Sequence, residues 1–276
     1  MKHKVIRDNF PSFTEKDLER IENKISDKCS DYFFVDFLKT TKGNIQDAYR
    51  LFVFDENFRC LLFKYVLRFE IQIKNYFVEC LIKETKDLHF WSNPKYFIFK
   101  DEKEFSNLRK KIEDSFKNLN IKSMIADSYA ATYVMSFGTF IQMFKNINPS
   151  LKRKFVQQYT KYLPIHNFNV LYKYLLCMRA LRNRCAHGTH IVSNSFVNQL
   201  SQFSAIQKEE CLNPNMKIMS IFELTLYFLM NLLNCKNEFS KDLKHILEKN
   251  KNLYSRYGGK QPINPSIIEK LFAQKN

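Results

Sequence analysis

Glycine and proline are scarce in this chain of 276 residues. It contains 5 glycines and 7 prolines, whereas average usage would give roughly 19 and 14 in a chain of this length. Tight β-hairpins need these residues at their turns, so the composition disfavours a large antiparallel sheet. The sequence therefore predicts an all-α protein.

The chain also lacks paired cysteines and long apolar runs. Its seven cysteines are scattered, odd in number and without a CxxC pair, which predicts reduced, mostly buried thiols and argues against a zinc site. No stretch reaches the ~18 apolar residues of a membrane span, and the opening MKHKVIRDNFPSF has no apolar run of signal-peptide length. We therefore expect a cytoplasmic protein with no metal ion, no cofactor and no membrane partner.

Positive charge dominates the composition. The 44 lysines and arginines outnumber the 28 acidic residues and give a formal net charge of +16 at pH 7, with a pI near 9.4. The sequence has no glycine-rich phosphate loop, dinucleotide fingerprint or serine-centred elbow. Nucleic acid is therefore the expected partner, ahead of a nucleotide cofactor, and a basic membrane-surface protein is the alternative.

Helical periodicity recurs along the chain. Apolar residues repeat every three or four positions over 55–84, which predicts one long core helix, and a second long helix is predicted to end before Gly188. Ser12 and Glu15 have capping-box spacing, which predicts the start of a first helix. Further helices are predicted near 31–39, 43–54, 101–119, 128–146, 150–160, 194–210, 216–235 and 239–249, with an irregular segment at 89–99 and a loop before a short terminal helix.

The end of the second long helix concentrates polar residues. The stretch MRALRNRCAHGTH, 178–190, holds Arg182 five positions before His187. Asn183 and His187 are four apart and share a helical face, and a long arginine side chain can bend towards them. A basic group in the last helical turn is also ordinary capping chemistry, so a purely structural interpretation stays open.

Such a patch suits RNA cleavage without a metal ion. The ribose 2′-OH must lose a proton as it attacks phosphorus, the leaving 5′-oxygen must gain one, and the added negative charge must be neutralised. Arg182, Asn183 and His187 are therefore the candidate catalytic residues. The candidate RNA-binding residues are Arg179, Arg184, His190, Asn194, Lys152 and Arg153. Their structural alternatives are solvated helix charges for the arginines and a polar capping loop for the residues after Gly188.

Three residues outside this stretch, Glu70, Lys74 and Ser136, have structural interpretations, and one of them also has a functional alternative. Glu70 and Lys74 are four apart on the long predicted helix, in the favourable order for an ion pair. The functional alternative is that Glu70 orients Arg182. Ser136 opens the sequence SFGT and is predicted to cap a helix next to the site.

The stretch LRNRCAHGTHIVSN resembles the signature of Abi-like abortive-infection proteins, a bacterial anti-phage family whose core is a HEPN domain with an Arg-x4–6-His ribonuclease motif. Here Arg182, Asn183 and His187 fill the arginine, polar and histidine places of that motif. The segments 51–77 and 133–147 are similar to the N-terminal core helix and the Ser-Phe-Gly-Thr segment of the same family.

The resemblance covers about 50–200. It implies a HEPN-type helical bundle with additional helices, a symmetric homodimer that joins two Arg–His motifs, and metal-independent RNA cleavage. We therefore expect an N-terminal helical extension at 1–50, an Abi-like HEPN domain at 51–250, and a loop with a short helix at 251–276. The expected function is an endoribonuclease toxin of abortive-infection defence, regulated by a bound RNA. The alternative is a non-catalytic RNA-binding protein of the same fold.

Overall fold

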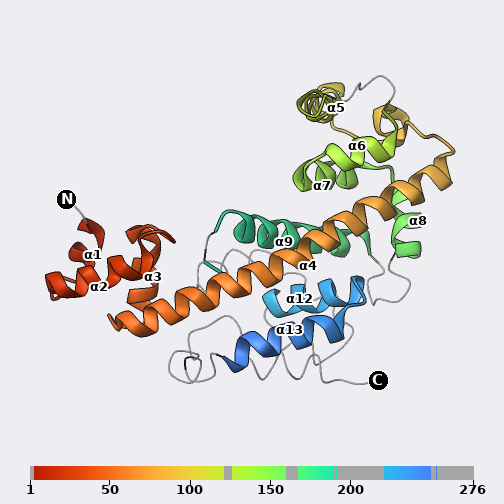
Figure 1. The fold of residues 1–276 in the computed structure, drawn as a ribbon. Coiled ribbons are helices and arrows are strands. Elements are labelled where there is room, and N and C mark those ends of the chain that lie inside the picture. Colours follow the sequence, from red (N-terminus) through yellow and green to blue (C-terminus); the bar gives the residue numbers. More distant parts are fainter. Residues whose placement is uncertain are drawn as a thin grey trace. The chain divides into compact units, whose positions relative to one another are not determined.

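The protein is built from helices, as the computed structural model in Figure 1 shows. The described residues are 3–120, 126–159, 167–188, 190–191, 221–249 and 253. They contain no β-strand, and their β-type pairing is an isolated antiparallel bridge between Phe97 and Ile147. The all-α fold expected from the composition is therefore confirmed. None of the described helices combines the length and apolar character needed to cross a membrane.

The chain divides into two compact units. Unit 1 contains the described residues of Met1–Leu62, His187–Phe196 and Lys236–Asn276, and unit 2 contains those of Phe63–Ala186 and Val197–Cys235. Two of these boundaries matter for function: one falls inside the long helix α4 (Ile45–Thr85), and one falls directly after α9 (Phe168–Ala186). The expected division at 50/51 also lies inside α4, and the three-part organisation stays a prediction.

Unit 1 gathers three short helices at the first turns of α4, as Figure 1 shows. Its helices are α1 (Lys4–Asn9), α2 (Glu15–Ile25), α3 (Asp31–Thr40), the α4 residues up to Leu62, and α13 (Lys236–Glu248). Their apolar faces form the core of the unit, where Ile6, Phe34 and Phe58 are fully buried. Helix α1 was not anticipated from the sequence, because a helix of six residues is too short to display periodicity.

The first capping box lies two residues later than expected. The Thr14 hydroxyl accepts a hydrogen bond from the Asp17 backbone N–H at 3.3 Å, and the Asp17 carboxylate accepts one from the Thr14 N–H at 3.0 Å. The prediction of a capping box at Ser12 and Glu15 was therefore wrong, although the predicted helix is present as α2. Phe13 stacks on Phe10 with ring centroids 5.0 Å apart, so the chain turns here before α2 begins.

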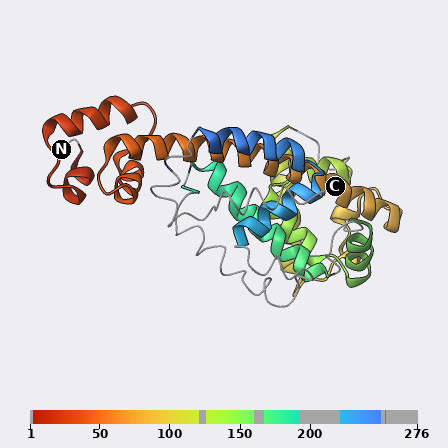
Figure 2. The same cartoon turned by 90° about the horizontal axis from the view of Figure 1, so that it is seen from below.

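Unit 2 packs its helices around the second half of α4. They are α5 (Glu102–Asn118), α6 (Ser128–Val134), α7 (Phe137–Asn146), α8 (Pro149–Tyr159), α9 and α12 (Ile221–Leu232), with two 3-10 turns, η1 (Phe90–Ser92) and η2 (Pro94–Tyr96). Helix α7 packs on both α5 and α9. Helix α12 also packs on α9, and the two lie side by side in Figures 1 and 2. The 3-10 turns confirm the irregular segment expected at 89–99.

Two long helical segments differ from expectation. The segments 43–54 and 55–84 form one helix of 41 residues, since no glycine or proline lies between them to end it. Conversely, the segment 128–146 is broken after Val134. Ser136 is extended there, and its hydroxyl accepts a hydrogen bond from the Thr139 N–H at 3.1 Å. The predicted Ser136 cap is therefore confirmed, and it starts α7.

The helices expected after α9 are only partly covered. The segments 216–235 and 239–249 correspond to α12 and α13. The predicted helix at 194–210 and the terminal helix lie outside the described residues.

Candidate functional site

Helix α9 carries the predicted motif where its apolar stripe ends. Leu175, Met178 and Leu181 are fully buried along one face of the helix. Arg182 follows as a partly exposed residue, and Asn183 is exposed. The motif thus begins at the edge of the core of unit 2, where a side chain can contact buried groups on one side and solvent on the other.

A buried ion pair on α4 lies against this part of unit 2. Glu70 and Lys74 are each 8% exposed, and the Lys74 ammonium donates to Glu70 Oε1 at 2.8 Å. The same ammonium donates to the backbone carbonyl of Met135 at 2.8 Å. That carbonyl lies at the break between α6 and α7, so the pair connects α4 to the start of the SFGT segment. The expected Glu70–Lys74 ion pair is confirmed.

The second carboxylate oxygen of Glu70 faces Arg182. The Arg182 Nε lies 3.6 Å from Glu70 Oε2, and both atoms are buried without a hydrogen-bond partner. At that distance the attraction is coulombic, since a hydrogen bond requires closer approach. Glu70 therefore holds one cation on each oxygen, and the geometry agrees with the alternative in which it orients Arg182.

Arg182 also reaches towards its neighbour in the motif. Its Nη1 donates to the side-chain oxygen of Asn183 at 3.4 Å. The Arg182 side chain is 31% exposed although Nε is buried, so its exposed surface lies on other atoms. The arginine thus presents a fixed positive charge to solvent beside an exposed amide.

His187 belongs to unit 1, in the turn that follows α9. Its side chain is exposed, and Gly188 has the positive φ of 66° expected of a residue that ends a helix. The buried Asp55 carboxylate anchors this turn, because it accepts a hydrogen bond from the Ile191 N–H at 2.9 Å and another from Arg59 Nε at 2.9 Å. The histidine itself is free to meet a ligand, while the backbone that carries it is held.

Arg59 packs closely against the same turn. A Cβ atom on Gly188 would lie 3.3 Å from Arg59 Nη1, so the guanidinium group lies next to the backbone that follows His187. Neither Asp55 nor Arg59 was predicted as part of the site. The available signal was an acidic residue four positions before an arginine within an otherwise apolar helix pattern.

His190 lies in the core of unit 1, in contrast to its predicted contact with RNA. The residue is 9% exposed and stacks on Phe33 with ring centroids 3.9 Å apart. Its Nε2 lies 3.0 Å from the Phe33 carbonyl oxygen, and Phe37 packs edge-on against the ring. Burial lowers the pKa of the imidazole. A neutral, enclosed ring stabilises the unit and does not reach a phosphate at the surface.

The other predicted RNA-binding residues have different environments. Arg179 on α9 and Arg153 on α8 are exposed, while Arg184 is half-buried and makes contacts of its own. Lys152 is half-buried, with its ammonium 4.6 Å from the centre of the Phe168 ring. Burial and the nearby Lys145 lower the pKa of Lys152. The remaining candidate, Asn194, lies outside the described residues.

The buried thiols of Cys80 and Cys177 are poor candidates for chemistry. Burial raises the pKa of Cys177 to about 12 and that of Cys80 to about 11. Since the thiolate is the nucleophile and the metal ligand, these groups are inactive at neutral pH. Among the described residues, no group of three or more His, Cys, Asp or Glu side chains has a metal-binding arrangement.

The sequence model of the Abi-like protein family matches residues 14–193. The match covers well over half of the chain and includes Glu70, Lys74, Arg182 and His187. No curated protein and no solved structure matches the chain at a significant level.

Proposed function

Because the chain belongs to the Abi-like protein family, we propose that it is an endoribonuclease of abortive-infection defence with a HEPN-type active site. Arg182, Asn183 and His187 are the catalytic residues of this proposal. The observation that carries it is the contact of Arg182 with Glu70, a buried carboxylate that already holds Lys74.

This contact favours chemistry over helix capping. A capping arginine directs its guanidinium to the last carbonyl groups of its own helix. The contacts of Arg182 with described residues are instead the carboxylate of Glu70 on α4 and the side chain of Asn183. Burying a carboxylate is costly and is offset only by close partners. A buried carboxylate that holds an arginine in one orientation is expected where the position of the guanidinium group matters for catalysis.

The proposed reaction needs no group from outside the chain and the RNA. The ribose 2′-oxygen forms a bond to the adjacent phosphorus and loses its proton, and the bond from phosphorus to the 5′-oxygen breaks as that oxygen gains a proton. The products are a 2′,3′-cyclic phosphate and a 5′-hydroxyl. Arg182 stabilises the extra negative charge on the phosphorane, and Asn183 contacts a phosphate oxygen.

His187 transfers the proton in this proposal. An imidazole titrates near neutral pH and can therefore act as an acid or a base in one working range. The exposed ring at the end of α9 is accessible to a polynucleotide, and Asp55 and Arg59 hold the backbone behind it. We further propose that the working form is a homodimer and that a bound RNA restrains the toxin in its host.

The decisive experiment compares His187→Ala with His245→Ala, a matched change of an exposed histidine on α13. We expect His187→Ala to lower the cleavage rate at least about 100-fold, the usual contribution of a general acid or base. Thermal stability and RNA affinity remain near the wild-type values, and His245→Ala cuts normally.

Product ends and metal removal complete this test. We expect cyclic-phosphate ends and full activity after exhaustive treatment with EDTA. Wild-type protein that binds RNA without cutting it would instead support the non-catalytic RNA-binding function, and loss of activity in EDTA would contradict metal-independent cleavage.

A further inference from the structure

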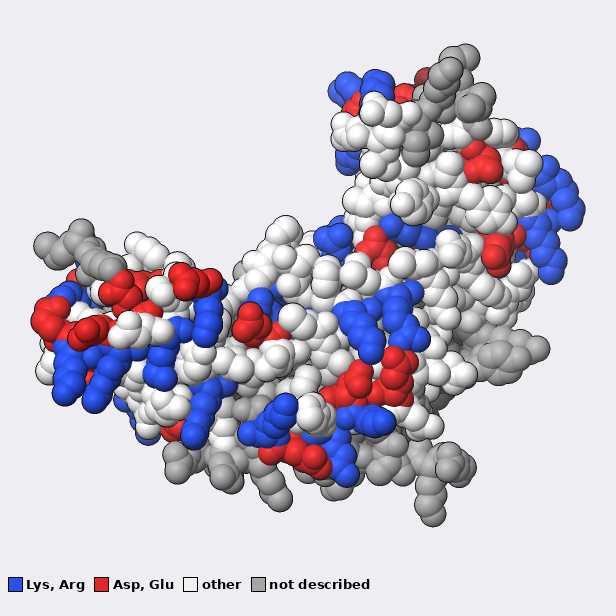
Figure 3. Space-filling model, viewed as in Figure 1, with Lys and Arg blue, Asp and Glu red and all other residues white. Residues whose placement is uncertain are grey.

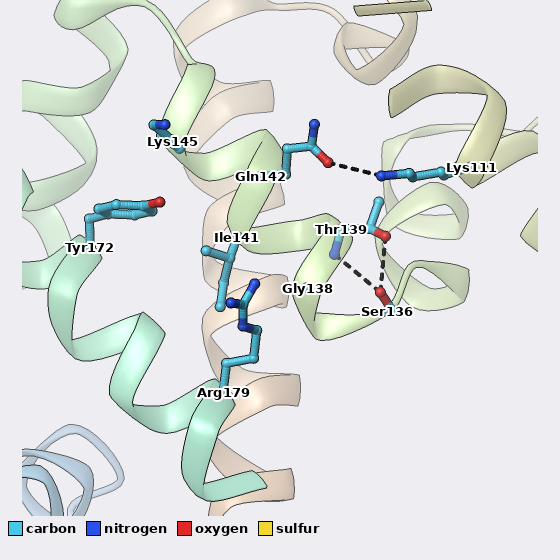
Figure 4. Close-up of a pocket in the computed structure, with 9 residues that line it drawn as sticks. All are labelled: Lys111, Ser136, Gly138, Thr139, Ile141, Gln142, Lys145, Tyr172 and Arg179. Carbon is cyan, nitrogen blue, oxygen red and sulfur yellow. Dashed lines mark hydrogen bonds between the residues drawn. The ribbon is translucent and has the colours of Figure 1, made fainter. Parts of the chain in front are cut away.

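Unit 2 contains a pocket of about 460 Å³ where α5, α7 and α9 meet. Lys111 from α5, Lys145 from α7 and Arg179 from α9 line it, and Figure 4 shows their side chains around the start and one face of α7. None of the residues that line the pocket is acidic. Within the described part of the chain, three cations from three helices therefore share one pocket without a carboxylate.

No carboxylate among the described residues pairs with these cations. Lys111 donates to the uncharged side-chain oxygen of Gln142 at 3.4 Å, a contact that directs the ammonium across the pocket (Figure 4). Lys145 and Arg179 form no ion pair with any described residue. Like charges in one pocket repel one another, and an anion bound among them removes that cost.

The wall formed by α7 is suited to close approach of an anion. Gly138 stands in the first helical turn after the Ser136 cap and presents no side chain. A Cβ atom there would lie 3.9 Å from Cδ and 4.0 Å from Nη1 of Arg179. Arg179 thus extends over the first turn of α7, next to the backbone N–H groups at the positive end of the helix dipole.

We propose that this pocket binds a phosphate group of the RNA strand, next to the phosphate that is cleaved. Arg179 and Arg182 are three positions apart on α9 and therefore neighbours on its surface. A strand whose reacting phosphate lies at Arg182 extends along α9 into the pocket. Half-buried Tyr172 lines the same pocket and offers a ring on which a base can stack.

The position of the phosphate relative to the scissile bond rests on the proposed ribonuclease function. The affinity of the pocket for RNA is independent of that function, because the three cations can bind a phosphate whether or not the RNA is cleaved. Binding is therefore measured with an oligoribonucleotide that is 2′-O-methylated throughout, because it has no 2′-OH to attack phosphorus. Failure of the pocket proposal and failure of the ribonuclease proposal then give different results.

The first measurement is the affinity for this oligonucleotide by fluorescence anisotropy over a range of KCl concentrations. Lys111→Gln, Lys145→Gln and Arg179→Gln are compared with Lys110→Gln, which removes an exposed charge from the next position on α5. Each pocket variant is expected to bind about 5- to 10-fold more weakly. The slope of log affinity against log salt should fall by about one for each lost phosphate contact. Lys110→Gln should change affinity less than about twofold.

The second measurement separates charge from shape at Gly138. Gly138→Ala adds only an uncharged Cβ with ordinary contacts, so it should weaken RNA binding far less than a charged side chain at the same position. Gly138→Asp places a carboxylate beside Arg179, which should abolish most RNA binding. Because an acidic residue is favourable in the first turn of a helix, the melting temperature should not fall.

The pocket proposal is overturned by equal effects of Lys110→Gln and the pocket variants, or by normal binding of Gly138→Asp. Wild-type protein that does not bind the oligonucleotide, or that binds free inorganic phosphate in the pocket equally well, overturns it too. A His187→Ala variant that still cuts RNA would contradict the catalytic role of His187, and wild-type protein that binds RNA without cutting it would contradict the ribonuclease function; both results leave these binding measurements intact.

Discussion

Glu70 is the carboxylate that pairs with both Lys74 and Arg182. It is buried, and its oxygens lie 2.8 Å from the Lys74 ammonium and 3.6 Å from Arg182 Nε. Removal of one partner from a buried pair leaves an uncompensated charge and typically costs about 3–5 kcal/mol. Glu70→Gln is therefore expected to lower the free energy of unfolding by about 3 kcal/mol in denaturant titrations. The matched change Glu113→Gln, in the more exposed Arg109–Glu113 pair, should cost less than about 1 kcal/mol.

A double variant separates the structural role of Glu70 from its role towards Arg182. Glu70→Gln with Lys74→Met removes both buried charges, so stability should largely recover. Arg182 then has no carboxylate beside it, and we expect the cleavage rate to stay at least about tenfold low while RNA affinity changes little. Recovery of both stability and cleavage would show that Glu70 serves Lys74 alone.

His190 makes the stability of unit 1 depend on pH. Burial lowers the pKa of its imidazole, against the opposing effect of Asp55 and Asp36. The unfolded chain, with a histidine pKa of about 6.5, binds this proton more readily than the folded chain. The contribution of neutral His190 to the free energy of unfolding is therefore fully present above about pH 6.5, and it is lost as the pH falls through the lowered pKa.

The measurement is the melting temperature of wild type and His190→Phe between pH 7.5 and 5. Phenylalanine keeps the ring against Phe33 and cannot be protonated. The wild type should be the more stable protein at pH 7.5, because it keeps the hydrogen bond to the Phe33 carbonyl, and its advantage should shrink as the pH falls. An advantage that stays constant would mean that His190 does not titrate in this range.

At the scale of elements, periodicity predicted most helices and mislocated several of their ends. The capping signal at Ser136 was readable in SFGT, yet the apolar pattern on both sides predicted one helix over 128–146. The break becomes evident only from the contact of the Met135 carbonyl with Lys74, 61 positions away. Similarly, Phe10 and Phe13 pack beside Gly43 just before α2 begins. Such contacts between residues distant in sequence cannot be predicted from the local pattern, so the start of α2 was placed too early.

The candidate site was predictable only where its residues are close in sequence. The spacing of Arg182, Asn183 and His187 was visible directly, whereas the contact with Glu70 spans more than a hundred positions and was one of two alternatives. Lys111 and Lys145 were not predicted at all. They join Arg179 because α5 and α9 pack on α7, and no local pattern records that packing.

Substitution of Gly188, in the turn after α9, tests whether cleavage requires the backbone next to His187 to be held in place. Gly188 has a φ of 66° and lies against Arg59. Alanine is strained in this conformation by about 1 kcal/mol, and its Cβ would crowd the guanidinium. Gly188→Ala is expected to lower stability by about 1–2 kcal/mol and to slow cleavage, whereas Gly188→Asn should be milder because asparagine tolerates a positive φ better. Denaturant titration and initial rates check both statements.

At the scale of the whole molecule, net charge predicts the class of partner but not where it binds. The net charge of the chain is +16, yet on the face shown in Figure 3 basic and acidic side chains are mixed over α1, α2 and α3. The pocket on α5, α7 and α9 differs because the charged residues that line it are all cations. The proposal of a binding surface at this pocket therefore rests on the local absence of carboxylates rather than on the total charge.

The last prediction concerns two copies of the chain. One motif supplies a single imidazole and the charge of Arg182, while 2′-OH attack benefits from both a base and an acid near the phosphate. A two-fold interface doubles these groups without any new residue, because it brings the same surface of both protomers together.

Wild-type protein is therefore mixed with increasing amounts of the Arg182→Ala/His187→Ala variant under conditions in which subunits exchange, and cleavage is measured per wild-type chain. If the active centre is shared, this activity should fall roughly in proportion to the wild-type fraction, since most wild-type chains then have an inactive partner. The same dilution with the His245→Ala variant controls for concentration and should leave activity per active chain unchanged. Constant activity with the double variant, once exchange has been verified with labelled chains, would mean that each chain cuts RNA alone.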